Sequence, residues 1–159
     1  MKRLWAPWRM EYINHQLEEE CFLCRAWESE DPEKHYVLKK GEASFVIMNT
    51  YPYNNGHLMV ASAAHQGGLE EIGGSVRGEI MELVSDSVRV LKEAISPHGF
   101  NVGINLGQSA GAGLTDHLHV HILPRWQGDT NYMPLLADVK VISEHLDDTY
   151  GKIVERFNR

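Results

Sequence analysis

Three histidines alternate with apolar residues in the stretch TDHLHVHILPRW, residues 115–126. On a helix, side chains advance by about 100° per residue, so the histidines and the residues between them would share no common face. On a β-strand, successive side chains point to opposite faces. The stretch therefore predicts a half-buried strand with Pro124 near its end and a row of imidazoles on one face, formed by His117, His119 and His121.

Composition limits the class of protein. The chain has 159 residues, of which 43% are hydrophobic and 23% charged, as expected for one globular domain. It contains no apolar run near the ~20 residues of a membrane span, and MKRLWAPWRMEY lacks a signal peptide's apolar segment, so we expect a cytoplasmic location. The net charge of −7 argues against general nucleic-acid binding but is compatible with a small anionic ligand bound locally.

The order of patterns along the chain predicts the fold class. Strands are expected within residues 35–50, broken at Lys40–Gly41, and at 56–62, 100–107 and the histidine stretch. Apolar residues at helical spacing predict one long helix over residues 75–96, and a C-terminal helix is expected over 143–157. This pattern favours an α+β fold with a mainly antiparallel five-stranded sheet. We expect a single domain over residues 1–159, with an N-terminal extension at 1–30 and a core at 36–126.

The two cysteines of the chain, Cys21 and Cys24, form a C-x-x-C motif within that extension. Such a pair is typical of a redox site or of half a metal site, although two unrelated thiols remain an alternative. The redox interpretation requires a preceding apolar strand, and the preceding INHQLEEE is not one. A tetrahedral metal site needs two further ligands, for which histidine is the obvious source.

Three histidines in a row allow more than one chemistry. They can hold a metal with an open position for water, or one can attack an electrophile while its neighbours orient it. The loop before the strand contains Gly111 and Gly113, whose backbone N–H groups can approach an anion without interference from a Cβ atom. A site built only around a metal does not explain this loop, so we favour a phosphate presented to an imidazole.

Two segments of the chain, the histidine stretch and residues 49–57, resemble those of a known family. HLHVHIL, residues 117–123, matches the signature of the histidine triad superfamily of nucleotide hydrolases and transferases, and NTYPYNNGH, residues 49–57, is similar to its nucleotide-side segment. LWAPWRMEYI and PRWQGDTNYMP more narrowly resemble diadenosine tetraphosphate phosphorylases and related hydrolases. The resemblance covers nearly the whole chain, with only the C-terminal helix weakly matched.

The resemblance implies two-step nucleotidyl transfer. His119 would attack the α-phosphorus of a nucleotide, and His121 would assist the leaving group. His57 would lie near the nucleotide or the triad, Asn49 would bind the ribose hydroxyls, and Asn105 would stand near the phosphate.

The loop before the triad departs from the family pattern. Many relatives carry Gly-Gln-Ser or Gly-Gln-Thr there, whereas this chain has AGAGLTD, and its own GQS lies upstream at residues 107–109. We therefore expect the backbone around Gly111, Gly113 and Leu114 to bind the phosphate, through the N–H groups of residues 112–114.

The resemblance also implies a structural zinc and a dimer. Zinc-bearing branches use two N-terminal cysteines, a histidine after the Gly-His strand and the first histidine of the triad, here Cys21, Cys24, His65 and His117. Four such ligands close a tetrahedron and leave no position for catalytic water. Relatives are commonly homodimers that join their sheets, and we expect the same of this chain.

The resulting function is cleavage of dinucleoside polyphosphates, with the sequence leaning toward a phosphorylase over a hydrolase. A nucleoside phosphoramidase, a nucleotide-binding regulator with little turnover and a metal-dependent hydrolase using all three histidines are the alternatives. A phosphorylase needs local positive potential to attract phosphate to an acidic chain. Arg125 can supply that potential or can form a surface ion pair. The expected partner is a small nucleotide, rather than a nucleic-acid polymer or a membrane.

Overall fold

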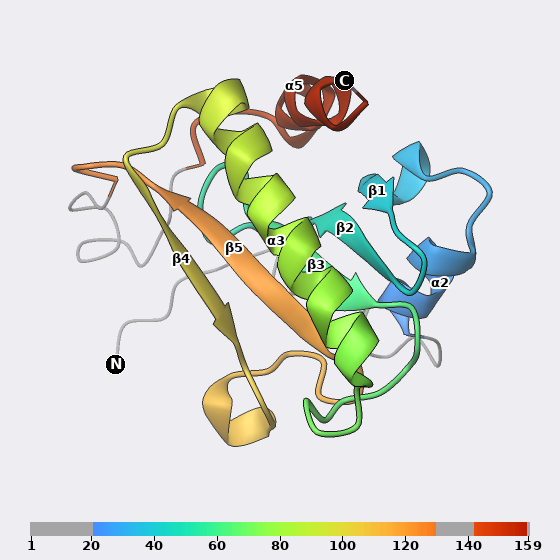
Figure 1. The fold of residues 1–159 in the computed structure, drawn as a ribbon. Coiled ribbons are helices and arrows are strands. Elements are labelled where there is room, and N and C mark those ends of the chain that lie inside the picture. Colours follow the sequence, from blue (N-terminus) through green and yellow to red (C-terminus); the bar gives the residue numbers. More distant parts are fainter. Residues whose placement is uncertain (1–20, 130–141, 159) are drawn as a thin grey trace, which may run out of the picture.

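A computed structural model describes residues 21–129 and 142–158 (Figure 1). Five strands form one antiparallel sheet in the order β1-β2-β3-β5-β4. They are β1 (Val37–Lys40), β2 (Ser44–Met48), β3 (Leu58–Ser62), β4 (Gly99–Ile104) and β5 (His119–Arg125). The described helices are α2 (Phe22–Glu28), α3 (Gly74–Ile95) and α5 (Leu146–Phe157), with short 3-10 turns η1 (Glu33–His35) and η2 (Gln108–Ala110). The predicted α+β class and five-stranded antiparallel sheet are confirmed.

Strand β5 lies inside the sheet, between β3 and β4. Its register pairs His119 with Ala61 and His121 with Met59, which puts these four side chains on one face. Pro124 lies one residue before the end of β5, where the strand pairs with β4 and no longer with β3. A proline is tolerated there because its missing N–H leaves no bond to β3 unmade.

Helix α3 covers the other face of the sheet (Figure 1). The apolar residues that alternate with the histidines pack in the core beneath it, and α5 joins the same core. The helix runs from Gly74 to Ile95, close to the predicted 75–96, and ends where Ser96 adopts a left-handed conformation. Helix α5 begins three residues later than predicted because His145 is its N-cap and accepts a hydrogen bond from the Asp147 amide.

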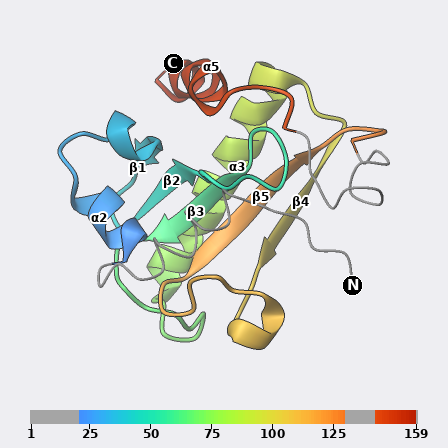
Figure 2. The same cartoon turned by 180° about the vertical axis from the view of Figure 1, so that it is seen from behind.

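Helix α2 packs on the histidine side of the sheet, beside β1 and β2 (Figure 2). Leu23 and Ala26 of this helix are buried against a cluster that includes Phe45, Met59 and Ala61. The described part of the predicted extension therefore packs across the sheet. LWAPWRMEYI and residues 130–134 of the second branch-like segment lie outside the described residues. None of the helices in the described ranges is long and apolar enough to cross a bilayer.

Candidate active site

The imidazoles of His119 and His121 lie side by side on β5. Their ring centroids are 4.8 Å apart and the rings meet edge to face. The two residues are only 8% and 9% exposed, and His117, two residues before the first residue of the strand, is 1% exposed. His119 and His121 thus share one face of an inner strand, as the alternation predicts, whereas His117 lies in a bend before the strand, and all three are largely removed from water.

The proton of neutral His119 has a defined position. Its Nδ1 lies 2.8 Å from the backbone carbonyl oxygen of His117. Because a carbonyl can only accept, His119 Nδ1 carries the hydrogen and Nε2 keeps a lone pair. Burial lowers the pKa of His119, an effect that its hydrogen bond to His117 partly opposes. His119 is therefore neutral at pH 7, with the nucleophilic nitrogen unprotonated.

Two hydrogen bonds determine which nitrogen of His121 carries its hydrogen. The backbone N–H of Tyr53 donates to His57 Nδ1 at 3.2 Å, so neutral His57 carries its own hydrogen on Nε2. That nitrogen lies 2.9 Å from His121 Nδ1, which must accept. Burial, and then the charge of His119, lower the pKa of His121 to about 4. Neutral His121 therefore presents an Nε2–H donor.

Two further residues of the 49–57 loop, Asn49 and Tyr53, lie beside His57 and His121. Asn49 places its Nδ2 3.3 Å from His57 Nδ1 and accepts the Tyr51 N–H at 2.9 Å. The Tyr53 ring lies 4.9 Å from the His57 ring and 6.0 Å from the His121 ring, centroid to centroid, although Tyr53 is 51% exposed. The sequence analysis did not identify Tyr53, because YPYNNG carries only the signal of a turn.

The glycine loop leads from β4 toward the histidine strand. Asn105 follows β4 directly, and a Cβ atom at Gly111 would lie 3.9 Å from its Nδ2. Gly111 has φ 87°, a conformation that glycine adopts without strain, and it ends η2. The Ala112 amide is already paired with the Gly107 carbonyl at 3.4 Å, and Leu114 packs against the α2 cluster. Of the three backbone N–H groups at residues 112–114 that were predicted to bind phosphate, that of Ala112 already donates within the loop.

Four metal-ligand side chains meet where α2 approaches the start of β5. Their ligand atoms all lie within 4.8 Å of one another, and they belong to Cys21, Cys24, His65 and His117. The sulfur–nitrogen distances are 3.3 Å from Cys21 to His117, 3.3 Å from Cys24 to His65, and 3.5 Å from Cys24 to His117. A tetrahedral ion with metal–sulfur distances of ~2.3 Å and metal–nitrogen distances of ~2.0–2.1 Å has sulfur–nitrogen edges of about 3.6 Å.

The surroundings of the cluster suit a metal. His117 Nε2 donates to the Ser62 carbonyl at 2.7 Å, which leaves Nδ1 as the ligand atom. Burial and the neighbouring Cys21 raise the pKa of the Cys24 thiol to about 11. A cation is therefore needed to keep Cys24 as a thiolate at neutral pH. Since the His117 carbonyl also accepts from His119, the cluster adjoins the candidate nucleophile.

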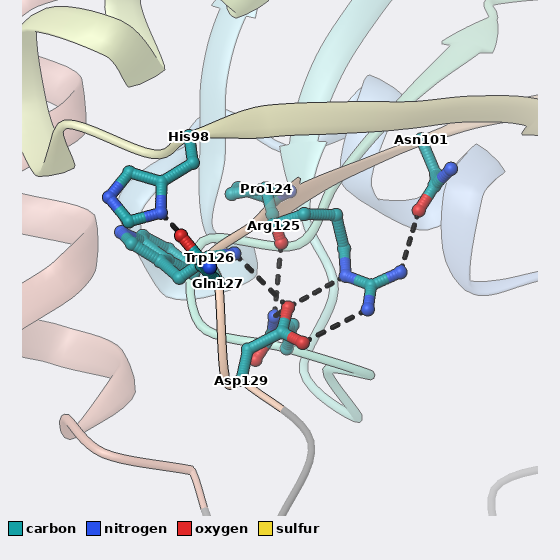
Figure 3. A network of polar contacts seen from close by, with 8 residues as sticks. His98, Asn101, Pro124, Arg125, Trp126, Gln127 and Asp129 are labelled. Atoms are coloured by element: carbon teal, nitrogen blue, oxygen red, sulfur yellow. Dashed lines mark hydrogen bonds and ion pairs between the residues drawn. The ribbon is translucent and has the colours of Figure 1, made fainter.

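Arg125 forms the surface ion pair that the sequence left as one of two options (Figure 3). Its Nε and Nη2 atoms contact the Asp129 carboxylate at 2.7 and 3.0 Å, and Nη1 donates to Asn101 at 2.8 Å. Its charge is balanced by Asp129, so the structure does not support Arg125 as the attractor of a phosphate acceptor.

Comparison with known proteins agrees with this geometry. Residues 30–128 match the family model described as HIT domain. An alignment of 167 positions with a Mycobacterium tuberculosis protein named AP-4-A phosphorylase shows 38% identity and covers 94% of this chain and 80% of that protein. A hypothetical histidine triad nucleotide-binding protein from Sulfolobus tokodaii superposes with a TM-score of 0.69 at 27% identity, covering 87% and 92% of the two chains. A zinc-bound histidine triad family protein from Mycobacterium smegmatis gives 0.71 at 18% identity, covering 87% and 94%, a likeness of fold.

Proposed function

Because the chain belongs to the HIT domain family, we propose that it cleaves dinucleoside polyphosphates such as diadenosine tetraphosphate through a nucleotidyl intermediate on His119. The observation that carries this proposal is the unprotonated Nε2 of His119, set by the bond from Nδ1 to the His117 carbonyl. The 38% identity to a protein named AP-4-A phosphorylase supports the substrate class.

The proposed reaction has two displacements at one phosphorus. In the first, the Nε2 lone pair of His119 attacks the α-phosphorus, the bond to the bridging oxygen breaks, and ATP leaves. His121 stabilises the leaving oxygen through its Nε2–H. In the second, an oxygen of inorganic phosphate attacks, the phosphorus–nitrogen bond breaks, and ADP leaves with His119 restored. The covalent step divides one difficult displacement into two easier ones.

The acceptor is tested with diadenosine tetraphosphate and millimolar phosphate. Phosphorolysis yields ADP plus ATP, and that is the expected result. AMP plus ATP, unchanged by added phosphate, would identify a hydrolase. Turnover of a nucleoside phosphoramidate with none of diadenosine tetraphosphate would replace the proposed substrate class.

The nucleotide contacts remain proposals that follow from the loop positions. Asn49 lies beside His57, as expected of a residue on the nucleotide side, and its remaining lone pair and N–H are assigned to the ribose hydroxyls. Asn105 and the backbone of Gly111, Gly113 and Leu114 are assigned to the phosphate chain; the Gly111 N–H already donates to the Gln108 carbonyl at 3.0 Å, so Gly111 contributes by letting the phosphate approach closely. Oriented N–H groups in such a loop can bind an anion without a basic side chain.

We further propose that Cys21, Cys24, His65 and His117 hold a structural zinc. Two sulfurs and two nitrogens, three of whose sulfur–nitrogen distances are 3.3–3.5 Å, suit zinc, and a closed set of four ligands has no open position for catalysis. The bound ion would join α2 to the start of the histidine strand. The proteins compared above include one that is described as zinc-bound.

A homodimer is also proposed, formed through the free edge of β4. Within the described residues this edge strand pairs with β5 alone, and its exposed side chains include Val102 (47% exposed) and Ile104 (36% exposed). Edge strands of monomeric proteins are usually protected by charges or proline, which this strand lacks. The cytoplasmic location and the single-domain organisation expected from the sequence stay predictions.

A further inference from the structure

Asn54 is a buried polar residue that the proposed reaction does not use. It is 7% exposed, and its side-chain nitrogen donates to the Pro124 carbonyl at 3.0 Å and to the Asp129 carboxylate at 2.9 Å. The same carboxylate accepts from Arg125 and from the Trp126 amide (Figure 3). Both hydrogens of the Asn54 amide group are thus committed, and the 49–57 loop is fastened to the end of β5.

This fastened residue stands next to the group that sets the His57 proton. The Asn54 carbonyl accepts the backbone N–H of His57 at 3.2 Å, and the preceding residue, Tyr53, donates its own N–H to His57 Nδ1 at 3.2 Å. Two donors face His57 Nδ1, the Tyr53 amide at 3.2 Å and Asn49 Nδ2 at 3.3 Å, and both favour the Nε2–H form of His57. The Tyr53 amide is the one that adjoins Asn54. If that amide moves away, only the longer Asn49 contact disfavours a hydrogen on His57 Nδ1, and with the hydrogen there His121 would have to donate from Nδ1 and lose its Nε2–H.

We propose that Asn54 and Asp129 are positioning residues that hold the proton of His121 on Nε2, acting through the Tyr53 amide and His57. They contact neither the proposed nucleophile nor the assigned nucleotide-binding residues. The inference depends on the proposed function for its kinetic consequences, whereas the hydrogen positions can be measured without any substrate.

The first experiment measures imidazole nitrogen shifts by long-range ¹⁵N–¹H NMR in the full-length protein. In the wild type, we expect His57 and His121 each to show an unprotonated Nδ1 and a protonated Nε2. Asn54→Asp keeps the side-chain shape but removes both donors and sets two carboxylates against each other. We expect this variant to show both forms of His57 and His121. Wild-type shifts in a folded Asn54→Asp protein would overturn the proposal.

The second experiment measures kcat and KM on diadenosine tetraphosphate. We expect Asn54→Asp and Asp129→Asn each to lower kcat at least tenfold with KM changed less than threefold, because the nucleotide contacts are untouched. Because Asn54 and Asp129 act through one contact, the double variant should lose little more kcat than the more affected single variant. Two single losses that simply multiply in the double variant would count against the proposed contact.

Asn101→Ala is the matched control. It removes a partner of Arg125 at the solvent side of the same network and leaves Asn54 intact, so wild-type shifts and kcat are expected. An equal loss in Asn101→Ala would show that general loosening, not the Asn54 contact, is responsible. Should Asn54→Asp not fold, Asp129→Asn decides the question by the same spectra. A wild type with no turnover but the expected shifts would refute the proposed function and leave this inference standing.

Discussion

In His57, His119 and His121, one ring nitrogen is hydrogen-bonded to a neighbour, and that bond determines whether the other ring nitrogen carries a hydrogen. His119 donates to a backbone carbonyl and keeps Nε2 free, whereas His121 accepts from His57 and keeps a hydrogen on Nε2. Two neighbouring imidazoles on one strand therefore differ in which ring nitrogen carries the hydrogen, because their partners differ. In the proposed reaction, the same residue type would supply a nucleophile at one position and a donor two residues later.

We predict that His119→Gly lowers turnover of diadenosine tetraphosphate by at least about 10³-fold, since the variant has no atom to attack phosphorus. Nucleotide binding by calorimetry and the circular dichroism spectrum should stay near wild type, because the His119 side chain, although buried, belongs to neither hydrophobic core cluster. A rate close to wild type in His119→Gly would refute the covalent mechanism.

Helix α2 is too short to be stable alone, and two kinds of contact hold it against the sheet. Its seven residues bury Leu23 and Ala26, and the cysteine pair at its start meets His65 and His117. The side chain of His117 belongs to the cluster, and its backbone carbonyl accepts the hydrogen bond that orients His119. The helix with the candidate metal-binding cysteines is thus connected to the strand with the proposed nucleophile.

We predict about one zinc per chain in protein purified without chelators, and its loss in Cys21→Ser. The variant should unfold about 5–10 °C earlier, since each kcal/mol lost shifts Tm by roughly 2–4 °C in a chain of this size. Metal analysis and thermal scans measure both effects, and chelator-treated wild type is the control. Wild-type protein without zinc, or full zinc content in Cys21→Ser, would contradict the assignment.

The β4 edge gives a separate prediction. Val102→Lys places a charge in the middle of that strand, where a second sheet would have to pair, so the variant should be monomeric. Light scattering after size exclusion should give twice the chain mass of 18.1 kDa for the wild type and the single mass for the variant. Equal masses for the two proteins would rule out β4 as the interface.

The buried histidines connect the site to the stability of the whole molecule. The folded pKa of His121 is about 4 against 6.5 for an unperturbed histidine, and that of His119 is lowered as well. Between pH 4 and pH 6.5, His121 binds a proton in the unfolded chain and does not bind one in the folded chain. The stability from neutral His121 is therefore complete above about pH 6.5 and is lost as the pH falls toward 4.

We predict that the free energy of unfolding falls more steeply with acid in the wild type than in His121→Asn. The shift in pKa corresponds to a difference on the order of 3 kcal/mol across this window. Urea unfolding at several pH values between 7.5 and 4.5 measures it, and the difference between the two curves isolates His121. Parallel curves would show that burial of His121 does not perturb its titration.

The strands and the long helix were predictable because their signals are local. Alternating apolar residues specify β5 whatever lies beside it, and apolar residues at helical spacing specify α3 within one residue at each end. The start of α5 was placed too early because the cap at His145 depends on a single weak hydrogen bond. The metal-ligand set followed from the family resemblance, since two cysteines alone do not name their partners.

The positions of the protons could not be predicted, because each depends on which acceptor or donor atom the folded chain brings to a ring nitrogen, whether that atom is close in sequence, as for His119 and His117, or distant, as for His57 and His121. The alternation of residues 117–121 places the imidazoles on one face, but it does not say that His57 meets His121 or that the Tyr53 amide meets His57. Likewise, the sequence left two possible roles for Arg125, and the structure pairs it with the nearby Asp129 and with Asn101 on the neighbouring strand. Local pattern determines which face a side chain occupies, whereas the partner that assigns its charge and its hydrogen comes from the packing of loops that no short-range pattern encodes.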